Sequence, residues 1–378
     1  MNDGRSRFLN VRVVVLIVIL VSVTYYGYTK KFKGYFYSLK CEKFNSCLHI
    51  HDEAGVIPAA DRPKFDQYLD WIFKESDIDL HLAFVKGTGS KTIEELALEK
   101  VQKLNIGGKS KEERGVLMLY DTQTRRFRIE VGYGLEEYFP DAFVSYLIHF
   151  HTRHYFGTND LSLGFRLLLR IMQHRIRQAI LGDAFDPRVV EFINKDRYLS
   201  GGAGVSAVMD NEDRLQRNEK LTAEERRYFK HQGSPEEAYL RYLEWLQLGK
   251  FDTHIELFTN NTQGYMSNLQ MSKAYFEYIL LQEYGREFKI DVRDELALLY
   301  FTNDPLVTPH FLVKGKNGWQ MDIMAEIGKS INRVGGVFTW DYRGTNDKYT
   351  KRFADKFVNI RNYIRIKYGD NRMLPIRG

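Results

Sequence analysis

Hydrophobic residues between positions 50 and 182 recur with two spacings, one typical of helices and one typical of strands. Phe65, Tyr68, Leu69 and Ile72 fall at i, i+3, i+4 and i+7, which predicts a buried stripe on a helix that begins at Pro58. Further helices are expected at 93–104, 141–154 and 161–181, and strands at 80–85 and as a pair within 115–131. Helices that alternate with strands favour an α/β fold, with a sheet covered by helices on both faces.

The pattern changes after residue 220, where helix signals come first and strand signals follow. Thr222 with Glu225, and Ser234 with Glu237, have the spacing of capping boxes and predict two helix N-termini. Strands are expected near 287–292, 296–301, 309–314 and 319–323, with a hairpin turn at Asn317-Gly318. Helices followed by strands predict a second, α+β domain at 221–345. Residues 183–220, which include a glycine-rich run, are expected to be a linker.

The N-terminus carries an apolar run with the length of a membrane span. After a short segment at 1–10, residues 11–28 contain no charge beyond Arg12, and roughly 17–25 apolar residues span a bilayer. The alternative is a cleaved signal peptide, but no small-x-small cleavage site follows the run. We therefore expect an uncleaved transmembrane helix in the lipid bilayer. Basic residues flank the run on both sides, so they do not fix its orientation.

Both cysteines of the chain, Cys41 and Cys47, lie in the juxtamembrane segment 29–49. In an oxidising compartment they could form one short-loop disulfide, and two unpaired thiols are the alternative. The spacing of the pair is not a zinc signature.

The stretch from Gly107 to Asp141 holds the most distinctive motifs of the chain. It reads Gly107-Gly108-Lys109-Ser110, then Gly115-Val116-Leu117-Met118-Leu119, then Arg128-Ile129-Glu130-Val131-Gly132-Tyr133-Gly134-Leu135-Glu136, and Asp141 follows. This order resembles the TPM domain, which occurs in thylakoid-lumen, bacterial-envelope and animal receptor-accessory proteins. His51–Ile57 is similar to the opening of that domain. The resemblance covers residues 50–182, about a third of the chain. It implies that the body of the protein lies on the periplasmic or another extracytoplasmic side.

Four acids are the best candidates for a site: Asp52, Asp121, Glu136 and Asp141. Glycines on both sides of Tyr133 would aim Glu136 and Asp141 at the end of the sheet, where α/β sheets usually place sites. Oxygen ligands suit a hard cation such as Ca²⁺ or Mg²⁺. Because some TPM relatives bind calcium or act as acid phosphatases, the resemblance also implies metal-assisted hydrolysis of phosphate esters. The alternative is that Asp52 and Asp141 cap helices and Glu136 pairs with an arginine.

Two other patterns give weaker signals. His149, His151 and His154 do not share one helical face, and no neighbouring Cys or acid completes a zinc set, so we expect ordinary partly buried or surface histidines. Gly108-Lys109-Ser110 resembles the end of a P-loop, but Lys103 stands where that motif needs glycine.

The C-terminal part contributes a pocket candidate and a basic tail. The segment from Phe301 to Asp322 looks like the last hairpin of SnoaL-like, cone-shaped domains, whose pocket could bind a small molecule. Residues 346–378 hold nine Lys and Arg against three Asp, which accounts for the whole net charge of +6. Phe353, Phe357, Ile360 and Ile364 form an apolar stripe there. Such a basic amphipathic helix can lie on a membrane, dock on a partner or fold back onto its own domain.

Two functions are the leading hypotheses at this point, and a small-molecule binder that works through the second domain is a third. The first is a membrane-anchored envelope protein, acting without catalysis as an accessory, assembly or quality-control factor for a membrane protein complex. The second is a divalent-metal-dependent phosphatase that uses the acidic cluster. Nucleic acid is not an expected partner of a protein body outside the cytoplasm.

Overall fold

The computed structural model places most of the chain between residues 36 and 357. It describes residues 36–152, 154, 161–193, 206–208, 220–252, 254–267, 272–302, 304, 307–326, 331–332, 341–342 and 347–357, with single positions at 16, 20, 22 and 34. Apart from those single positions, the transmembrane helix predicted at 11–28 lies outside the described residues. Among the helices that the structure describes, none has both the length and the apolar character that a membrane span needs.

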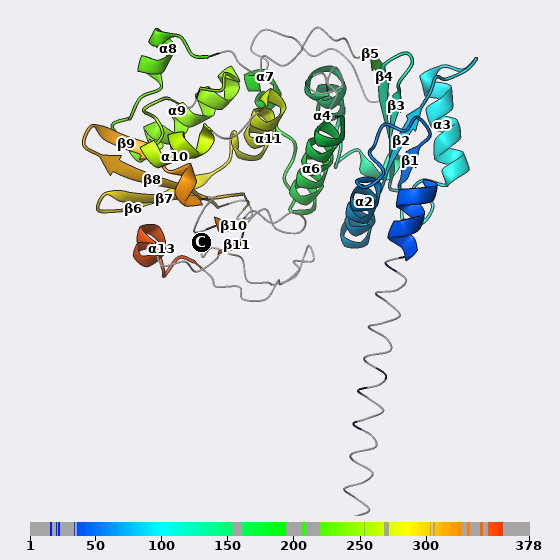
Figure 1. Cartoon of the computed structure of the whole chain (residues 1–378), viewed down its shortest axis with the longest axis horizontal. Helices are drawn as coiled ribbons and strands as arrows, with labels where there is room; N and C mark the ends of the chain where they lie inside the picture. Colours follow the sequence, from blue (N-terminus) through cyan, green and yellow to red (C-terminus); the bar gives the residue numbers. More distant parts are fainter. Residues whose placement is uncertain are drawn as a thin grey trace, which may run out of the picture.

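The first half of the chain forms a five-stranded mixed sheet in the order β1-β2-β3-β4-β5 (Figure 1). The strands are β1 (Ile50–Asp52), β2 (Asp79–Val85), β3 (Gly115–Asp121), β4 (Arg126–Val131) and β5 (Ser206–Val208). The first three are parallel, and β4 and β5 each run antiparallel to the strand before them. Every residue of β2 and β3 is buried, as expected for central strands that are covered on both faces.

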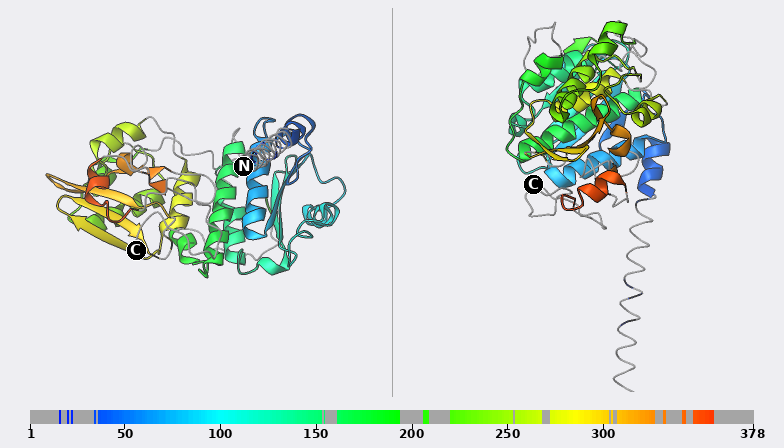
Figure 2. Two further views of the ribbon diagram at one scale, coloured as in Figure 1. Left: turned by 90° about the horizontal axis from the view of Figure 1, so that it is seen from below. Right: turned by 90° about the vertical axis from the view of Figure 1, so that its left-hand side faces the viewer.

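Helices cover both faces of this sheet, which confirms the predicted architecture. Leu82 and Met118 belong to the main core under α2, α4 and α6, whereas Leu119 packs with Ile93 and Ala97 of α3 on the other face (Figures 1 and 2). The elements are α2 (Arg62–Ser76), α3 (Ile93–Leu104), the 3-10 turn η1 (Tyr133–Leu135), α4 (Asp141–Tyr146), the π-helical turn η2 (Leu147–His151) and α6 (Leu161–Ile180). The helix predicted from Pro58 begins only at Arg62, because a turn precedes it in which the Asp61 N–H donates to the Pro58 carbonyl (2.8 Å).

The second half follows the predicted order of helices and then strands. The helices are α8 (Ala223–Tyr228), α9 (Pro235–Leu248), α10 (Asn260–Met266) and α11 (Lys273–Glu283). An antiparallel sheet in the order β6-β7-β8-β9 follows, with β6 (Phe288–Arg293), β7 (Leu296–Phe301), β8 (His310–Gly315) and β9 (Gly318–Met321). Both capping boxes are present at Thr222 and Ser234, as predicted. The predicted hairpin is also present, but β8 turns into β9 through Lys316 and Asn317, and Gly318 already pairs with Gly315.

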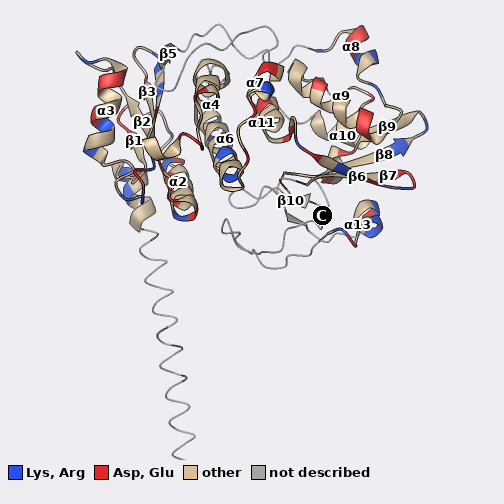
Figure 3. Ribbon diagram, turned by 180° about the vertical axis from the view of Figure 1, so that it is seen from behind, with Lys and Arg blue, Asp and Glu red and all other residues tan. Residues whose placement is uncertain are grey.

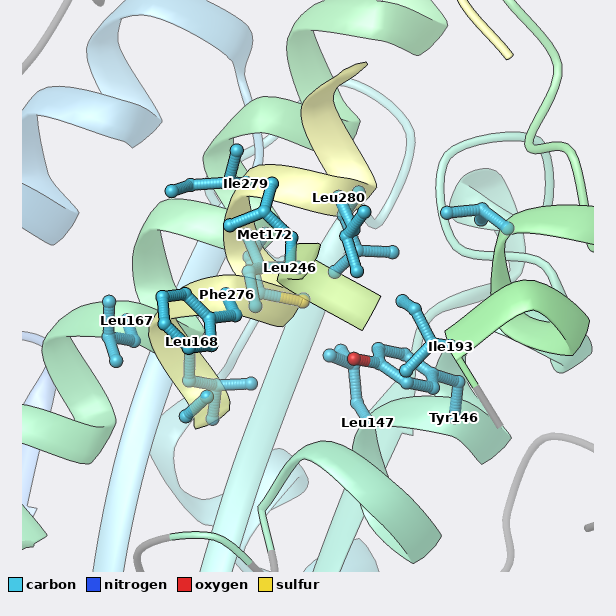
Figure 4. Packing of buried hydrophobic residues seen from close by; sticks show 14 of the residues in the cluster. Tyr146, Leu147, Leu167, Leu168, Met172, Ile193, Leu246, Phe276, Ile279 and Leu280 are labelled. Atoms are coloured by element: carbon cyan, nitrogen blue, oxygen red, sulfur yellow. The ribbon is translucent and has the colours of Figure 1, made fainter. Parts of the chain in front are cut away.

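The two halves share one hydrophobic core. Leu168 and Met172 of α6 lie against Phe276, Ile279 and Leu280 of α11 (Figure 4). In turn, α11 packs on α9, which lies over the second sheet (Figure 1). A buried ion pair joins the halves as well, because Arg177 of α6 donates from Nη2 to Asp304 Oδ2 (2.9 Å) and both side chains are inaccessible to solvent. The first half therefore continues into the second without a break in packing.

One segment differs from what the sequence predicts, and another follows an alternative that the sequence left open. The predicted linker 183–220 contains helix α7 (Arg188–Ile193), whose Val189 and Val190 are buried, and strand β5, which pairs with β4. The described beginning of the tail folds back onto its own domain. It contains α13 (Lys348–Arg352), and Tyr349, Phe353 and Phe357 pack against the β7–β8 face. Ile360 and Ile364, the rest of the predicted stripe, lie outside the described residues.

The remaining described elements are short, and they are α12 (Ile323–Ala325), β10 (Ile331–Asn332) and β11 (Asp341–Tyr342), the last two forming an antiparallel pair. On the outer helices, charge follows the helix dipole. Acidic residues occupy the first turn of α3 and of α8, and basic residues occupy the last turn (Figure 3).

Candidate functional site

Asp52 and Asp121 lie at the same edge of the sheet, because they are the last residues of the parallel strands β1 and β3. Asp52 accepts hydrogen bonds from the N–H groups of Val56 (2.8 Å) and Ile57 (3.0 Å), one on each oxygen. Asp121 is fully buried and accepts from the N–H groups of Gly87 (2.7 Å) and Gln123 (3.0 Å). A third bond comes to Asp121 from the Thr124 hydroxyl (2.5 Å). Both carboxylates hold turns together. Asp52 does not cap a helix, which was the alternative that the sequence left open, because α2 begins only at Arg62.

Glu136 and Asp141 lie at the opposite edge. Strand β4 runs back along β3, so that Val131 pairs with Val116 and the turn after it reaches the amino end of β3. Glu136 follows η1 there, and Asp141 begins α4; both are exposed. The seven residues of β3 separate the two pairs of acids by about 20 Å. The expectation that all four acids meet at one end of the sheet is therefore corrected, because β4 is antiparallel.

The glycines around Tyr133 instead bring segments of main chain together. A Cβ on Gly132 would lie 2.5 Å from the carbonyl oxygen of Glu113, and one on Gly134 would lie 2.7 Å from that of Glu112. The Gly132 N–H donates to the Gly115 carbonyl (2.8 Å), and Leu135 is fully buried. The turn is thus fixed at both ends, and Tyr133 between them is 92% exposed.

A second cluster of titratable side chains lies on the α3 face of β1 and β2. It includes none of the four predicted acids. His81 Nε2 lies 2.9 Å from Asp79 Oδ1, and His49 Nδ1 lies 3.3 Å from the same oxygen. The other ring nitrogen of His81, Nδ1, lies 2.9 Å from His51 Nε2. His49, Asp79 and His81 are each at most 6% exposed. One ligand atom from each of these three side chains lies within 4.8 Å of the other two.

The surrounding main chain fixes this cluster on two sides. Asp66 of α2 accepts from the N–H groups of His49 (2.6 Å) and Ile50 (3.2 Å) and so sets the start of β1. The second oxygen of Asp79, Oδ2, accepts from the Gly107 N–H (2.9 Å). Gly107 adopts φ +82°, and a Cβ there would meet the Gly115 nitrogen at 2.8 Å. The glycine motif of the sequence therefore helps to orient a carboxylate that lies 28 residues earlier in the chain.

Burial and neighbouring charges control the protonation of this cluster. Burial alone would raise the pKa of Asp79, but the His49 and His81 rings and the Gly107 N–H outweigh it and hold that pKa far below its usual value. Burial lowers the pKa of His51 to about 4, with the nearby His81 and Lys100 acting in the same direction. At neutral pH the cluster thus contains an ionised Asp79 and an uncharged His51.

These four residues carry a sequence signal that the acidic candidates obscured. His49 and His51 are two apart at the start of β1, and Asp79 and His81 are two apart in β2, so the members of each pair point to the same side of the sheet. The parallel register pairs Ile50 with Leu82 and brings the two pairs side by side. Sequence spacing alone does not give that register.

His151 and His154 meet an acid that sequence proximity could not reveal. His154 Nε2 lies 2.7 Å from Glu277 Oε1, and His151 Nδ1 lies 3.3 Å from Glu277 Oε2. Burial would raise the pKa of Glu277, but His154 and His151 outweigh it and hold that pKa well below the usual range. The group is buried in the core between α11 and the end of η2, so it joins the two halves of the chain.

The comparisons with known proteins concern the first half. A family model described as the TPM domain matches residues 50–173. The solution NMR structure of the N-terminal domain of a protein from P. gingivalis is similar at 22% sequence identity and a TM-score of 0.33, over 39% of this chain and 92% of that chain. No curated protein matches the chain. The family match ends before the second half, where the SnoaL-like resemblance stays a prediction. The chain thus contains a TPM domain, which spans residues 50–173.

Proposed function

We propose that this protein is a membrane-anchored, extracytoplasmic accessory or assembly factor that binds a membrane protein complex through the edge of its TPM domain around Tyr133. The apolar run at 11–28 is the proposed anchor in the lipid bilayer. The disulfide between Cys41 and Cys47 supports an oxidising compartment for the residues that follow.

The exposure of Tyr133 carries this proposal. A tyrosine ring that is 92% exposed has no packing role in the monomer, yet its main chain is held by Gly132, Gly134 and the buried Leu135. Preorganised aromatic side chains are the residues that most often dominate protein–protein binding energies. A rigid turn also reduces the entropy that binding would cost.

The side chains near Tyr133 indicate the chemistry of the partner. Glu113, Glu136 and Glu137 are exposed, and the neighbouring Arg114 is already paired with Glu112. This edge therefore suits a partner segment with arginine or lysine side chains, one of which could lie over the tyrosine ring. Glu136, a candidate metal ligand in the sequence, would on this proposal contact the partner.

The alternative is a phosphatase that uses Ca²⁺ or Mg²⁺ at the four acids. Two observations favour binding of a partner protein over catalysis at these acids. Asp52 and Asp121 direct their oxygens at main-chain N–H groups, and Glu136 and Asp141 lie at the other edge of the sheet. A metal-assisted mechanism needs the ligands at one place.

The test compares the mass of the native assembly for two tyrosine variants. Full-length protein is extracted from its own membranes in a mild detergent, and its complexes are separated by native electrophoresis. We expect Tyr133→Ala to shift the protein from a large complex to its own size, and Tyr228→Ala to leave the complex intact. Tyr228 is the matched control because it is 51% exposed in the other half of the chain. An unchanged complex in Tyr133→Ala with a normal melting temperature would refute the proposed surface.

A further inference from the structure

We propose that His49, Asp79 and His81 form a binding site for a divalent transition-metal ion, with Zn²⁺ as the best fit. The site lies on the α3 face of β1 and β2, at the amino end of β2, where Asp79 pairs with Gly115. It uses none of the four acids and does not include Tyr133. It is independent of the proposed accessory function, because a metal could bind here whether or not the Tyr133 edge has a partner.

The donor atoms and their spacing fit zinc. Two imidazole nitrogens and one carboxylate oxygen are the ligand types that Zn²⁺ takes, and three protein ligands leave a fourth position for water. Zinc–ligand distances of about 2.0–2.2 Å at tetrahedral angles place ligand atoms roughly 3.3–3.6 Å apart. His49 Nδ1 already lies 3.3 Å from Asp79 Oδ1. His81 Nε2 at 2.9 Å needs to withdraw by only a few tenths of an ångström.

His49 supplies a second, independent indication. Its Nδ1 atom is buried and faces Asp79 Oδ1, but it makes no hydrogen bond of acceptable geometry among the described residues. A buried polar atom without a hydrogen bond destabilises the folded state. A cation between His49, Asp79 and His81 would give this nitrogen a partner.

The groups around the three ligands match the outer shell of a zinc site. Metal-bound histidines usually donate their other ring N–H, and bound carboxylates usually accept a further hydrogen bond. His81 Nδ1 faces His51 Nε2 at 2.9 Å, and Asp79 Oδ2 accepts from the Gly107 N–H at 2.9 Å. These contacts use His81 Nδ1 and Asp79 Oδ2, which are not the atoms proposed to bind the metal.

Metal binding would link two strands of the sheet. His49 lies at the entrance to β1, two residues after Cys47 of the disulfide, and Asp79 and His81 lie in β2. A metal here would tie the first strand of the TPM domain to the second, at the point where the chain arrives from the proposed anchor. The two imidazole ligands discriminate against Ca²⁺ and Mg²⁺, which prefer oxygen.

The test is a titration of the full-length protein in detergent, stripped with a chelator beforehand. Calorimetry with Zn²⁺ should show one site that an excess of Ca²⁺ or Mg²⁺ does not compete for. Asp79→Asn and His81→Gln keep the side-chain volume and should weaken Zn²⁺ binding at least about tenfold. His231→Gln is the matched control, because His231 faces Glu256 at 3.3 Å in the second half and should not affect binding.

Cobalt supplies a readout that does not depend on stability. Co²⁺ in place of Zn²⁺ should give the visible absorption of a tetrahedral site in the unmodified protein and lose it in Asp79→Asn. Circular dichroism of the metal-free variants should show that they fold. Absence of Zn²⁺ binding to the stripped, folded protein would overturn the proposal. So would undiminished binding in both Asp79→Asn and His81→Gln.

Discussion

The carboxylate of Glu277 in α11 lies 2.6 Å from the hydroxyl of Tyr146 in α4, although 131 residues separate the two in sequence. Tyr146 donates to Glu277 Oε2, and His154 lies against the other oxygen at 2.7 Å. This contact is buried between helices of the two halves. It makes the TPM domain and the C-terminal half parts of one packed structure, so their stabilities should be coupled.

Glu277→Ala should therefore destabilise the whole chain. The change leaves the Tyr146 hydroxyl and the histidine rings without their buried acceptor, and loss of one partner in such a group costs about 3–5 kcal/mol. Scanning calorimetry should show one transition at a lower temperature. Glu256→Ala is the control, since its side chain is 70% exposed and the change should alter stability by less than about 0.5 kcal/mol. Equal effects from both variants would refute the coupling.

His310 should make stability fall at alkaline pH. Burial would lower the pKa of His310, but the carboxylates of Glu283 and Glu326 on its two sides outweigh it and raise that pKa to about 10. The folded protein thus holds this proton more tightly than the unfolded chain, whose histidines titrate near 6.5. The stabilisation is complete below that pH and is lost as pH rises toward 10.

Urea unfolding across this pH range would check the prediction. The free energy of unfolding should decline with pH in the unmodified protein and decline less in His310→Gln. His231→Gln, which changes a partly exposed histidine, should retain the full slope. A His310→Gln profile parallel to that of the unmodified protein would contradict the assigned pKa.

Gly107 and Gly264 should respond to alanine in opposite directions. Gly107 has φ +82° and its Cβ would press on the main chain of Gly115, so Gly107→Ala should cost about 1–3 kcal/mol. Gly264 lies in α10, and a Cβ added there would meet nothing within 4 Å, so Gly264→Ala should stabilise by up to about 1 kcal/mol. Chemical denaturation of the two variants measures both values, and a neutral Gly107→Ala would mean that the close packing of residues 107 and 115 is not required.

The protein should not hydrolyse phosphate esters through the four acids. With Ca²⁺ or Mg²⁺ present, we expect the full-length protein to give the same rate as Glu136→Ala, namely the rate without protein. Asp121→Asn should instead lower the melting temperature, because its carboxylate accepts three hydrogen bonds in the turns. Turnover that disappears in a folded Glu136→Ala protein would favour the phosphatase over the accessory role.

Local patterns in the sequence predicted most helices and strands, because the interactions that start and end these elements are between residues close in sequence. The capping boxes at Thr222 and Ser234 and the hairpin turn before Gly318 each depend on residues a few positions apart. The strand β5 was missed because only three residues of the predicted linker pair with β4.

The candidate sites depended on contacts that local patterns do not contain. Glu136 appeared to point to the same place as Asp52, but the antiparallel return of β4 carries it to the other edge of the sheet. The meeting of His49 with His81 depends on the register of β1 on β2, and that of His154 with Glu277 depends on the packing of α11. The glycine motif was detectable in the sequence, where it was expected to aim acids at a site. In the structure its glycines instead allow main-chain segments to approach closely.

The accessory function is tested most directly by photo-crosslinking from position 133. A photo-reactive amino acid replaces Tyr133 in the full-length protein, and the same amino acid replaces Tyr228 in a control. Irradiation of intact membranes should give one defined adduct from position 133 and none from position 228, because only Tyr133 lies at the proposed interface. No adduct from position 133, or equal adducts from both positions, would contradict the account.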